Sequence, residues 1–243
     1  MTFARIDAPT PNFNDRLHPV DMLVLHYTGM EDGPSALARL RDPASEVSAH
    51  YVVEEDGSVY VLAPEEKRAW HAGRSRWQGD DDLNSRSIGV EIVNGGHDYG
   101  LPPFPDAQID AVIALSREIL ARWGIPQSRV VGHSDIAPDR KQDPGERFPW
   151  ARLAMAGVGL WPRAPRSEDF EGPPCDIADL QGDLKTIGYA VEPSGALDET
   201  THAVLRAFQR RWRPSAITGE VDAETCRLAR DLAEQRQSGS RAR

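Results

Sequence analysis

The sequence predicts an α/β fold, in which a mixed central β-sheet is flanked by helices and followed by a small all-α domain of three helices. Two short apolar runs each end in a histidine, which is typical of buried strands that lead to a functional site. A long segment with helical periodicity lies between them, and strands that alternate with helices indicate a mixed sheet. Three more helical segments follow a proline-rich stretch and predict the second domain.

Three segments in the first part of the chain have the character of strands. Residues 22–26 (MLVLH) form a continuous apolar run, which indicates a buried central strand. Residues 48–64 contain two β-rich runs joined by an Asp-Gly dipeptide, which supplies the positive-φ positions of a tight hairpin. Residues 87–94 (SIGVEIVN) alternate, so that Val90 faces one side of a strand and Glu91 the other.

The periodicity changes at Asp106. Apolar residues recur at helical spacing from there to residue 123, with Asp106 as the expected N-cap and Gly124 as the stop signal. The next run, residues 129–133 (RVVGH), predicts a short strand that ends in His133. In sheets of this kind, functional groups collect at strand ends and in the loops beyond them.

A segment rich in proline and charge divides the chain. We expect a first domain over residues 1–162, a linker over 163–174, a helical domain over 175–236 and a polar, frayed tail over 237–243. The three helices of the second domain are expected within residues 176–189, 198–212 and 222–235.

The composition of the 243-residue chain is that of an ordinary folded protein, with 40% hydrophobic and 27% charged residues. Its formal net charge of −10 argues against nucleic acid as a partner, because binding a phosphate backbone requires clustered Lys and Arg. No apolar run approaches the roughly 18 residues of a membrane helix, so we expect no membrane span.

The N-terminal residues predict a cytoplasmic location, because they lack the pattern of a secretory signal and a lipid-attachment cysteine. In that reducing compartment, Cys175 and Cys226 are expected to be free buried thiols. A disulfide between the two cysteines is the alternative. The sequence does not indicate an oligomeric state.

Two histidines at the ends of predicted strands are candidate metal ligands. A rigid strand holds His26 and His133 in place while leaving each side chain able to point into a cleft. Together with Asp143 they would bind a tetrahedral zinc ion and leave one position open for water. The spacing alone is weak support, since His26 lies far from the other two in sequence. The remaining histidines without a motif are expected at the surface: His18, His97 and His202.

Five segments occur in order within roughly residues 20–160: VLHYTG, SAHYVVEEDGSVY, AWHAG, LNSRSIGVEIVN and VGHSDIAPDRKQDPGERFPW. They resemble the zinc-dependent N-acetylmuramoyl-L-alanine amidases, the type that includes bacteriophage T7 lysozyme and the peptidoglycan recognition proteins. The last segment is the most specific, because its histidine, lysine and aspartate have the order and spacing of the bacterial amidases. The resemblance implies that His26, His133 and Asp143 hold zinc, with Glu91 as catalytic acid/base and Lys141 beside the scissile carbonyl.

These residue types suit amide hydrolysis. Zinc lowers the pKa of a bound water to about 7, which provides a nucleophile at neutral pH. Glu91 would carry the proton of that water to the leaving nitrogen, and Lys141 would place a positive charge near the oxyanion. Each residue has a structural alternative: Glu91 as a salt-bridged strand residue, and Lys141 as a solvated loop charge.

The resemblance also indicates candidate substrate-binding residues, namely His50, Trp70, His71, Ala72, Asn84 and Arg86. His50 would lie near the metal cleft as a substrate contact or as support for a ligand, with plain packing as the alternative. Trp70 would stack on a sugar or brace the peptide, with core packing as the alternative. Asn84 and Arg86 would meet a carboxylate of the stem peptide, Arg86 through a bidentate pair.

The second domain resembles the three-helix peptidoglycan-binding domain found beside many wall hydrolases, in the segments DLQGDLKTIGY, GALDETTHAVLRAFQRRW and ITGEVDAETCRLA. Any small helical bundle would share its apolar spacing. A wall-binding domain would concentrate the catalytic domain on its substrate. The expected partner is therefore peptidoglycan or a muropeptide.

The family resemblance leaves two alternative functions open. One is a non-catalytic peptidoglycan recognition protein that has lost the metal, and the other is a zinc hydrolase of the same fold with a different amide target. The substrate and the location are also open. Soluble anhydro-muropeptides suit a cytoplasmic amidase, whereas intact wall suits the binding domain and makes a periplasmic or cell-wall location the alternative.

Overall fold

The computed structural model describes residues 3–163 and 173–241 of the chain. Its main sheet has six strands in the order β1-β5-β4-β7-β3-β8, and β5 is antiparallel to β4 while the other neighbouring pairs are parallel. This mixed sheet, flanked by helices and followed by a helical region, confirms the predicted fold class. The strands are β1 (Arg5–Asp7), β3 (Met22–Tyr27), β4 (Tyr51–Val53), β5 (Val59–Val61), β7 (Ser87–Ile92) and β8 (Val130–Gly132).

The predicted hairpin is formed by β4 and β5, with Gly57 at a φ of 88° in its turn. A small second sheet, which the sequence did not indicate, pairs β2 (Phe13–Asp15) with β6 (Lys67–Ala69). The other elements that precede the helical region are α1 (Gly33–Arg41), η1 (Pro43–Ser45), α2 (Leu83–Arg86), η2 (His97–Tyr99), α3 (Asp106–Trp123), η3 (Gln127–Arg129), α4 (His133–Ile136) and α5 (Trp150–Met155).

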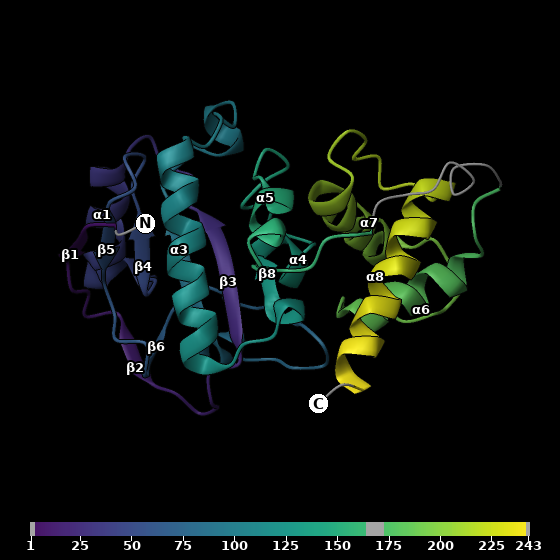
Figure 1. Ribbon diagram of the computed structural model, residues 1–243, viewed down its shortest axis with the longest axis horizontal. Coiled ribbons are helices and arrows are strands. Elements are labelled where there is room, and N and C mark those ends of the chain that lie inside the picture. Colours follow the sequence, from purple (N-terminus) through teal and green to yellow (C-terminus); the bar gives the residue numbers. More distant parts are fainter. Residues whose placement is uncertain (1–2, 164–172, 242–243) are drawn as a thin grey trace.

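The two faces of the main sheet pack against different partners. Alternate residues of β3 and β7, such as Leu25 and Val90, pack on the apolar side of α3. Helix α3 therefore covers one face of the sheet (Figure 1). It has the predicted bounds and ends at Gly124, but its N-cap is Pro105, so the capping role expected for Asp106 is wrong.

The helical region consists of α6 (Ile177–Ile187), α7 (Glu199–Trp212) and α8 (Ala223–Arg241). The side chains of Asp176 and Asp198 cap the first two helices, as carboxylates at N-caps commonly do. Helix α8 continues to Arg241, into the stretch for which a frayed tail was expected. Residues 164–172, most of the predicted linker, lie outside the described residues.

The helical region packs directly on the first part of the chain, beside α4 and the β8 edge of the sheet (Figure 1). One cluster of buried apolar residues joins Met22 and Val24, on the sheet face opposite α3, to Leu184 and Phe208 of the helices. The ring of Trp77 meets that of Tyr189 at 5.0 Å between centroids. The two regions therefore share one hydrophobic core.

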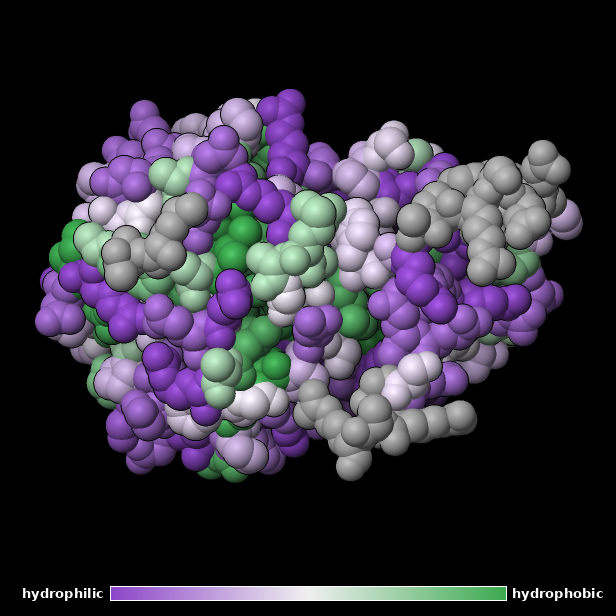
Figure 2. All heavy atoms as spheres, in the orientation of Figure 1, coloured by the Kyte–Doolittle hydropathy of each residue, from purple (hydrophilic) through white to green (hydrophobic). Residues whose placement is uncertain are grey.

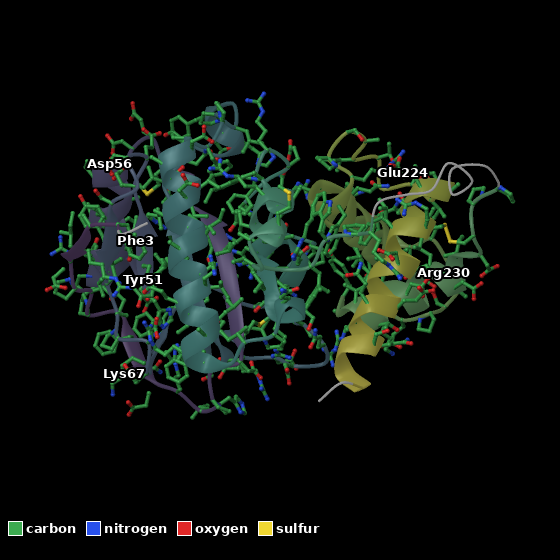
Figure 3. The ribbon with its side chains drawn as sticks, viewed as in Figure 1. Phe3, Tyr51, Asp56, Lys67, Glu224 and Arg230 are labelled. Atoms are coloured by element: carbon green, nitrogen blue, oxygen red, sulfur yellow. A yellow bond between two sulfur atoms is a disulfide. The ribbon has the colours of Figure 1, made fainter. Side chains whose placement is uncertain are left out.

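Cys175 and Cys226 form a disulfide, so the expectation of free thiols is wrong. The bond joins the segment before α6 to α8, and Figure 3 shows it in yellow, in the half of the molecule where Glu224 and Arg230 are labelled. Sequence spacing could not decide this point, because the contact depends on how α6 and α8 pack together.

The distribution of hydrophilic and hydrophobic residues on the surface is that of an ordinary folded protein. The face drawn in Figure 2 is mostly hydrophilic, and its apolar residues gather over the sheet-containing half. None of the helices in residues 3–163 and 173–241 combines the length and apolar character that crossing a membrane requires.

Candidate functional site

The register of the parallel strands places two candidate site residues side by side. His26, near the end of β3, pairs with Glu91, near the end of β7. Paired residues of neighbouring strands point to the same face of a sheet. Since Leu25 and Val90 face α3, His26 and Glu91 point to the opposite face, as the alternation of residues 87–94 predicted for Glu91.

His133 joins this group because β8 lies beside β3. It is the first residue of α4 and follows the last residue of β8 directly. The loop beyond α4 returns Asp143 to the same place. The Nδ1 atoms of His26 and His133 lie 3.0 Å apart, and Asp143 Oδ2 lies 3.0 Å from the first and 3.1 Å from the second. The structure thus brings the three candidate metal ligands together in one buried cluster.

Hydrogen bonds on the far side of each ring fix which nitrogen faces the cluster. His133 Nε2 lies 3.1 Å from the carbonyl oxygen of Ala72, which can only accept, so Nε2 carries the proton. The proton on the His26 ring is assigned through Ser87 and His71. Ser87 Oγ donates its proton to the Leu83 carbonyl oxygen, so it accepts from His71 Nε2. His71 Nδ1 is then an acceptor for His26 Nε2, at 3.1 Å. Both candidate ligand histidines therefore present Nδ1 as a lone pair.

The cluster fits a zinc ion. Ligand nitrogens at about 2.0–2.1 Å from tetrahedral zinc lie about 3.3 Å apart, close to the spacing seen here. Burial, followed by the neighbouring charge of His133, lowers the pKa of His26 to about 4, so His26 is neutral at pH 7. Burial opposes ionisation of Asp143, but the positive charge and N–H groups that His133 and His26 carry when protonated outweigh burial and hold the pKa of Asp143 well below the usual range. Neutral imidazoles and a carboxylate are the forms that bind a metal.

Glu91 lies beside this cluster with one carboxylate oxygen unsatisfied. Its Oε2 atom is buried and has no hydrogen-bond partner among the described residues. Burial, then the negative charge of Asp143, raises its pKa well above the usual range, and the positive charge of Lys141 opposes the shift. The alternative in which Glu91 serves as a salt-bridged strand residue does not fit this unpaired oxygen. Lys141 is half-buried and lines the same cleft.

The cleft around the cluster has a volume of about 400 Å³. Trp70 and His71, two of the candidate substrate-binding residues, line it. Trp70 is half-buried, and its indole nitrogen donates to Asn14 at 3.1 Å. His71 also accepts a hydrogen bond from the His26 ring, so it supports a candidate metal ligand and borders the cleft. Gly89 makes this possible, because a Cβ at that position would lie 2.4 Å from the His71 ring.

Two other candidates support the cleft from behind. Ala72 is buried and contributes its carbonyl oxygen, which accepts from His133 and from Arg140. Asn84 is also buried, and its side-chain oxygen accepts from the backbone N–H groups of His71 and Ala72. Neither side chain lines the cleft, so we assign both to holding the 71–72 segment and not to contacting a stem peptide.

The structure does not bring Arg86 to the cleft. Arg86 precedes β7, whereas Glu91 lies near its other end, and five residues of strand span about 16 Å. Its guanidinium pairs with Asp21 at 2.8 Å and with Asp80 at 3.3 Å. The structure therefore gives no support to the expected bidentate contact with substrate, because Arg86 and Glu91 lie at opposite ends of one strand.

His50 is likewise absent from the cleft lining and packs in the interior. Its Nδ1 atom accepts from the Gly89 N–H at 2.9 Å, and Nε2 lies 3.0 Å from the Lys67 carbonyl oxygen. The packing alternative is thus the one that the structure favours. Arg16 lies against the same ring, 2.8 Å from Nε2.

Acid is expected to destabilise the protein partly through His50. Burial, followed by the charge of Arg16, lowers its pKa in the folded state to about 3. The pKa in the unfolded chain is about 6.5, so the unfolded state binds one more proton between these values. Stability should then fall as the pH falls from about 6.5 to 3, by about 1.4 kcal/mol per pH unit for this group. Urea unfolding at a series of pH values measures the slope.

The His50→Gln variant isolates this contribution. Its free energy of unfolding should fall less steeply with falling pH than that of the wild type, by the amount that one bound proton contributes. His18→Gln, at an exposed position, should keep the wild-type slope. Equal slopes for all three proteins would contradict the assignment.

Sequence reasoning missed residues that line the cleft and others that support it from behind. His97, expected at the surface, lines the cleft, with Nδ1 at 2.9 Å from the Tyr27 hydroxyl and Nε2 at 3.0 Å from Glu146. Ser87 and Gly89 share the sheet face of Glu91, and the alternation of β7 could have identified them. No sequence pattern indicated the contact of His97, because it arises from a loop.

Known proteins resemble this chain in both regions. The family of N-acetylmuramoyl-L-alanine amidases matches residues 16–146, and the family described as a peptidoglycan binding domain matches residues 175–228. N-acetylmuramoyl-L-alanine amidase AmiD of Escherichia coli strain K12 is 41% identical over 233 residues, which cover 89% of this chain and 83% of AmiD. The 1,6-anhydro-N-acetylmuramyl-L-alanine amidase AmpD of Enterobacter cloacae is 42% identical over 107 residues, which cover 44% of this chain and 55% of AmpD.

Two solved structures have the same overall arrangement. Escherichia coli AmiD in complex with the substrate anhydro-N-acetylmuramic acid-L-Ala-D-γ-Glu-L-Lys has a TM-score of 0.80 at 41% identity, and the match covers 89% of each chain. AMPDH3 from Pseudomonas aeruginosa in complex with anhydromuramic pentapeptide has a TM-score of 0.80 at 37% identity, and the match covers 89% of this chain and 92% of AMPDH3.

Proposed function

This chain belongs to the family of N-acetylmuramoyl-L-alanine amidases, and from that premise we propose that zinc, held by His26, His133 and Asp143, serves its hydrolysis of the muramoyl-alanine amide. The bond cleaved joins N-acetylmuramic acid, or its anhydro form, to L-alanine. The relatives whose structures contain anhydromuramic peptides support this substrate class.

One observation carries the assignment of the metal. Two imidazole lone pairs and a carboxylate oxygen converge within 3.0–3.1 Å of one another, while hydrogen bonds on the far side of each ring hold its proton away. Three acceptors aimed at one point repel each other unless a cation lies between them. A divalent ion that prefers nitrogen and oxygen ligands satisfies this arrangement, and zinc is the ion that the donor set suits.

In the proposed mechanism, His26, His133 and Asp143 would hold the zinc ion, which would lower the pKa of a water to about 7 and so supply a nucleophile at neutral pH. Glu91 accepts a proton as the water oxygen bonds to the carbonyl carbon of the muramoyl group. It then returns the proton to the alanine nitrogen as the carbon–nitrogen bond breaks, which leaves a carboxylic acid and a free amine. Lys141 places its charge beside the carbonyl oxygen, where negative charge develops.

The helical region would bind peptidoglycan and raise the local concentration of the cleft on its substrate. Its resemblance to a peptidoglycan binding domain supports this role. We therefore propose intact peptidoglycan as the preferred substrate, with soluble anhydro-muropeptides as a second one.

The test measures zinc content and then products from two substrates. Purified sacculi and a small anhydro-muropeptide are digested in parallel, and mass spectrometry identifies peptides that begin with a free L-alanine. The proposal expects one zinc per chain and such peptides from both substrates, at the higher rate from sacculi. Bound zinc without these peptides would indicate another amide target, and a protein with neither zinc nor cleavage would be a recognition protein.

The disulfide bears on location. Disulfides persist in oxidising compartments and are rare in the reducing cytoplasm. We propose that the chain works outside the cytoplasm, where intact wall is found, which differs from the location that its N-terminal residues suggested. The Cys175–Cys226 bond supports this proposal.

Reduction of the disulfide is expected to destabilise the protein. The two cysteines are 51 residues apart, and crosslinking a loop of that length contributes at most about 4 kcal/mol through the entropy of the unfolded chain. Urea unfolding with and without reductant should therefore differ by about 2–4 kcal/mol. A Cys175→Ser/Cys226→Ser variant should not respond to reductant. Two titratable thiols in protein purified without reductant would contradict the bond.

A further inference from the structure

Arg211 is a buried charged residue that reaches from the helical region into the sheet region. It lies in the last turn of α7, and its side chain is 3% exposed. One terminal nitrogen donates to the carboxylate of Asp135 and the other to the Val130 carbonyl oxygen at 3.0 Å. Its guanidinium lies 3.9 Å from the centre of the Trp150 ring. A buried charge costs several kcal/mol unless it is paired, so this contact is closely fixed.

The partner of Arg211 belongs to the element that carries His133. Asp135 is fully buried at the third position of the four-residue helix α4, which begins at His133. Asp135 Oδ2 also accepts from the Gly132 N–H at 2.8 Å, and Oδ1 accepts from the Tyr189 hydroxyl at 2.6 Å. The carboxylate therefore ties the start of α4 to both the strand before it and the helical region.

A helix of four residues does not hold its own conformation, because the first turn costs more than its hydrogen bonds return. The direction of the His133 side chain thus depends on what fixes α4 from outside. On one side the Ala72 carbonyl oxygen accepts from the His133 ring. On the other side Asp135 is held by Arg211 and Tyr189, both of which come from the helical region.

We propose that Arg211 and Tyr189 are positioning residues for the metal ligand His133, and that the helical region is a structural part of the metal site as well as a wall-binding region. This inference rests on the proposed zinc site. Nearby, Arg210 lies 3.6 Å from Glu146, which contacts His97 of the cleft. The end of α7 therefore borders the site at two places.

The test measures zinc affinity in the full-length protein by competition with a chromophoric chelator. Arg211→Met should weaken zinc binding by about 10–100-fold, the usual effect of losing a group that orients a metal ligand. Tyr189→Phe, which removes a single hydroxyl, should weaken it by a smaller factor. Arg211→Lys keeps the charge but loses the fork that serves two acceptors, so it should fall between wild type and Arg211→Met.

The matched control is Arg213→Met. Arg213 is also a largely buried arginine at the end of α7, 16% exposed in its side chain, but it pairs with Asp222 and Glu224 within the helical region. Its loss should lower stability and leave zinc affinity unchanged.

Circular dichroism identifies which variants are folded before affinities are compared. Folded Arg211→Met and Tyr189→Phe proteins with wild-type zinc affinity would overturn the inference. If Arg211→Met does not fold, the zinc affinity of Tyr189→Phe tests the inference, since this variant keeps the ion pair between Arg211 and Asp135. A wild-type protein that binds no zinc would instead refute the proposed function, so the two failures are distinguishable.

Discussion

Replacing Glu91 by glutamine is expected to lower kcat by about 10²–10⁴-fold, the usual contribution of a general acid/base. Glutamine keeps the shape of the side chain but cannot accept and return a proton. Because Glu91 is not among the three clustered ligands, zinc binding should be retained. The measurements are steady-state kinetics on a muropeptide and the zinc content of the purified variant.

Glu65→Gln is the matched control for this variant. Glu65 is a buried glutamate with 6% exposure that accepts from Tyr51, Arg122 and Trp123, and it does not line the cleft. This variant should lose stability and keep its activity. A Glu91→Gln protein with bound zinc and wild-type kcat would refute the assigned role.

Removing the metal is expected to reduce hydrolysis to the background rate. Without a metal, the pKa of water returns from about 7 to 15.7, and no adequate nucleophile exists at neutral pH. Treatment with a chelator should abolish activity, and added zinc should restore it. Asp143→Ala should remain inactive at the same zinc concentration, since only two of the three clustered ligands remain.

Thermal unfolding gives an independent measure of the same site. A ligand that binds only the folded state stabilises it by about 2.7 kcal/mol at 100 times its dissociation constant. Zinc should therefore raise the Tm of the wild type and have no such effect on Asp143→Ala. Asp139→Ala, in the same loop, is the control, because Asp139 is exposed and pairs with the exposed Arg74. Full activity of the wild type after exhaustive chelation would refute a metal mechanism.

The parts of this site that local patterns predict are those at strand ends. The apolar run before His26 and the alternation around Glu91 indicate where each side chain points, and parallel strands bring such ends together. Arg86 shows that closeness in sequence does not place a residue at the cleft. It is close to Glu91 in sequence, but a strand of six residues separates its two ends in space.

Sequence patterns did not predict the contacts between segments that lie far apart in the chain. The helical spacing of α7 placed its apolar residues correctly, but it did not show that Arg211 would be buried against Asp135. Burial of an arginine depends on the carboxylate that meets it, and the two residues are 76 positions apart. For the same reason the pairing of Cys175 with Cys226 could not be decided from their spacing.

The apolar cluster that runs through both halves of the molecule restricts how such a protein can be rearranged. Deleting residues 175–241 would leave side chains such as Met22, Val24 and Trp77 without their covering. Large uncovered apolar patches promote self-association. A fusion of residues 1–162 to a different wall-binding domain would therefore need polar side chains in place of these apolar ones to remain monomeric.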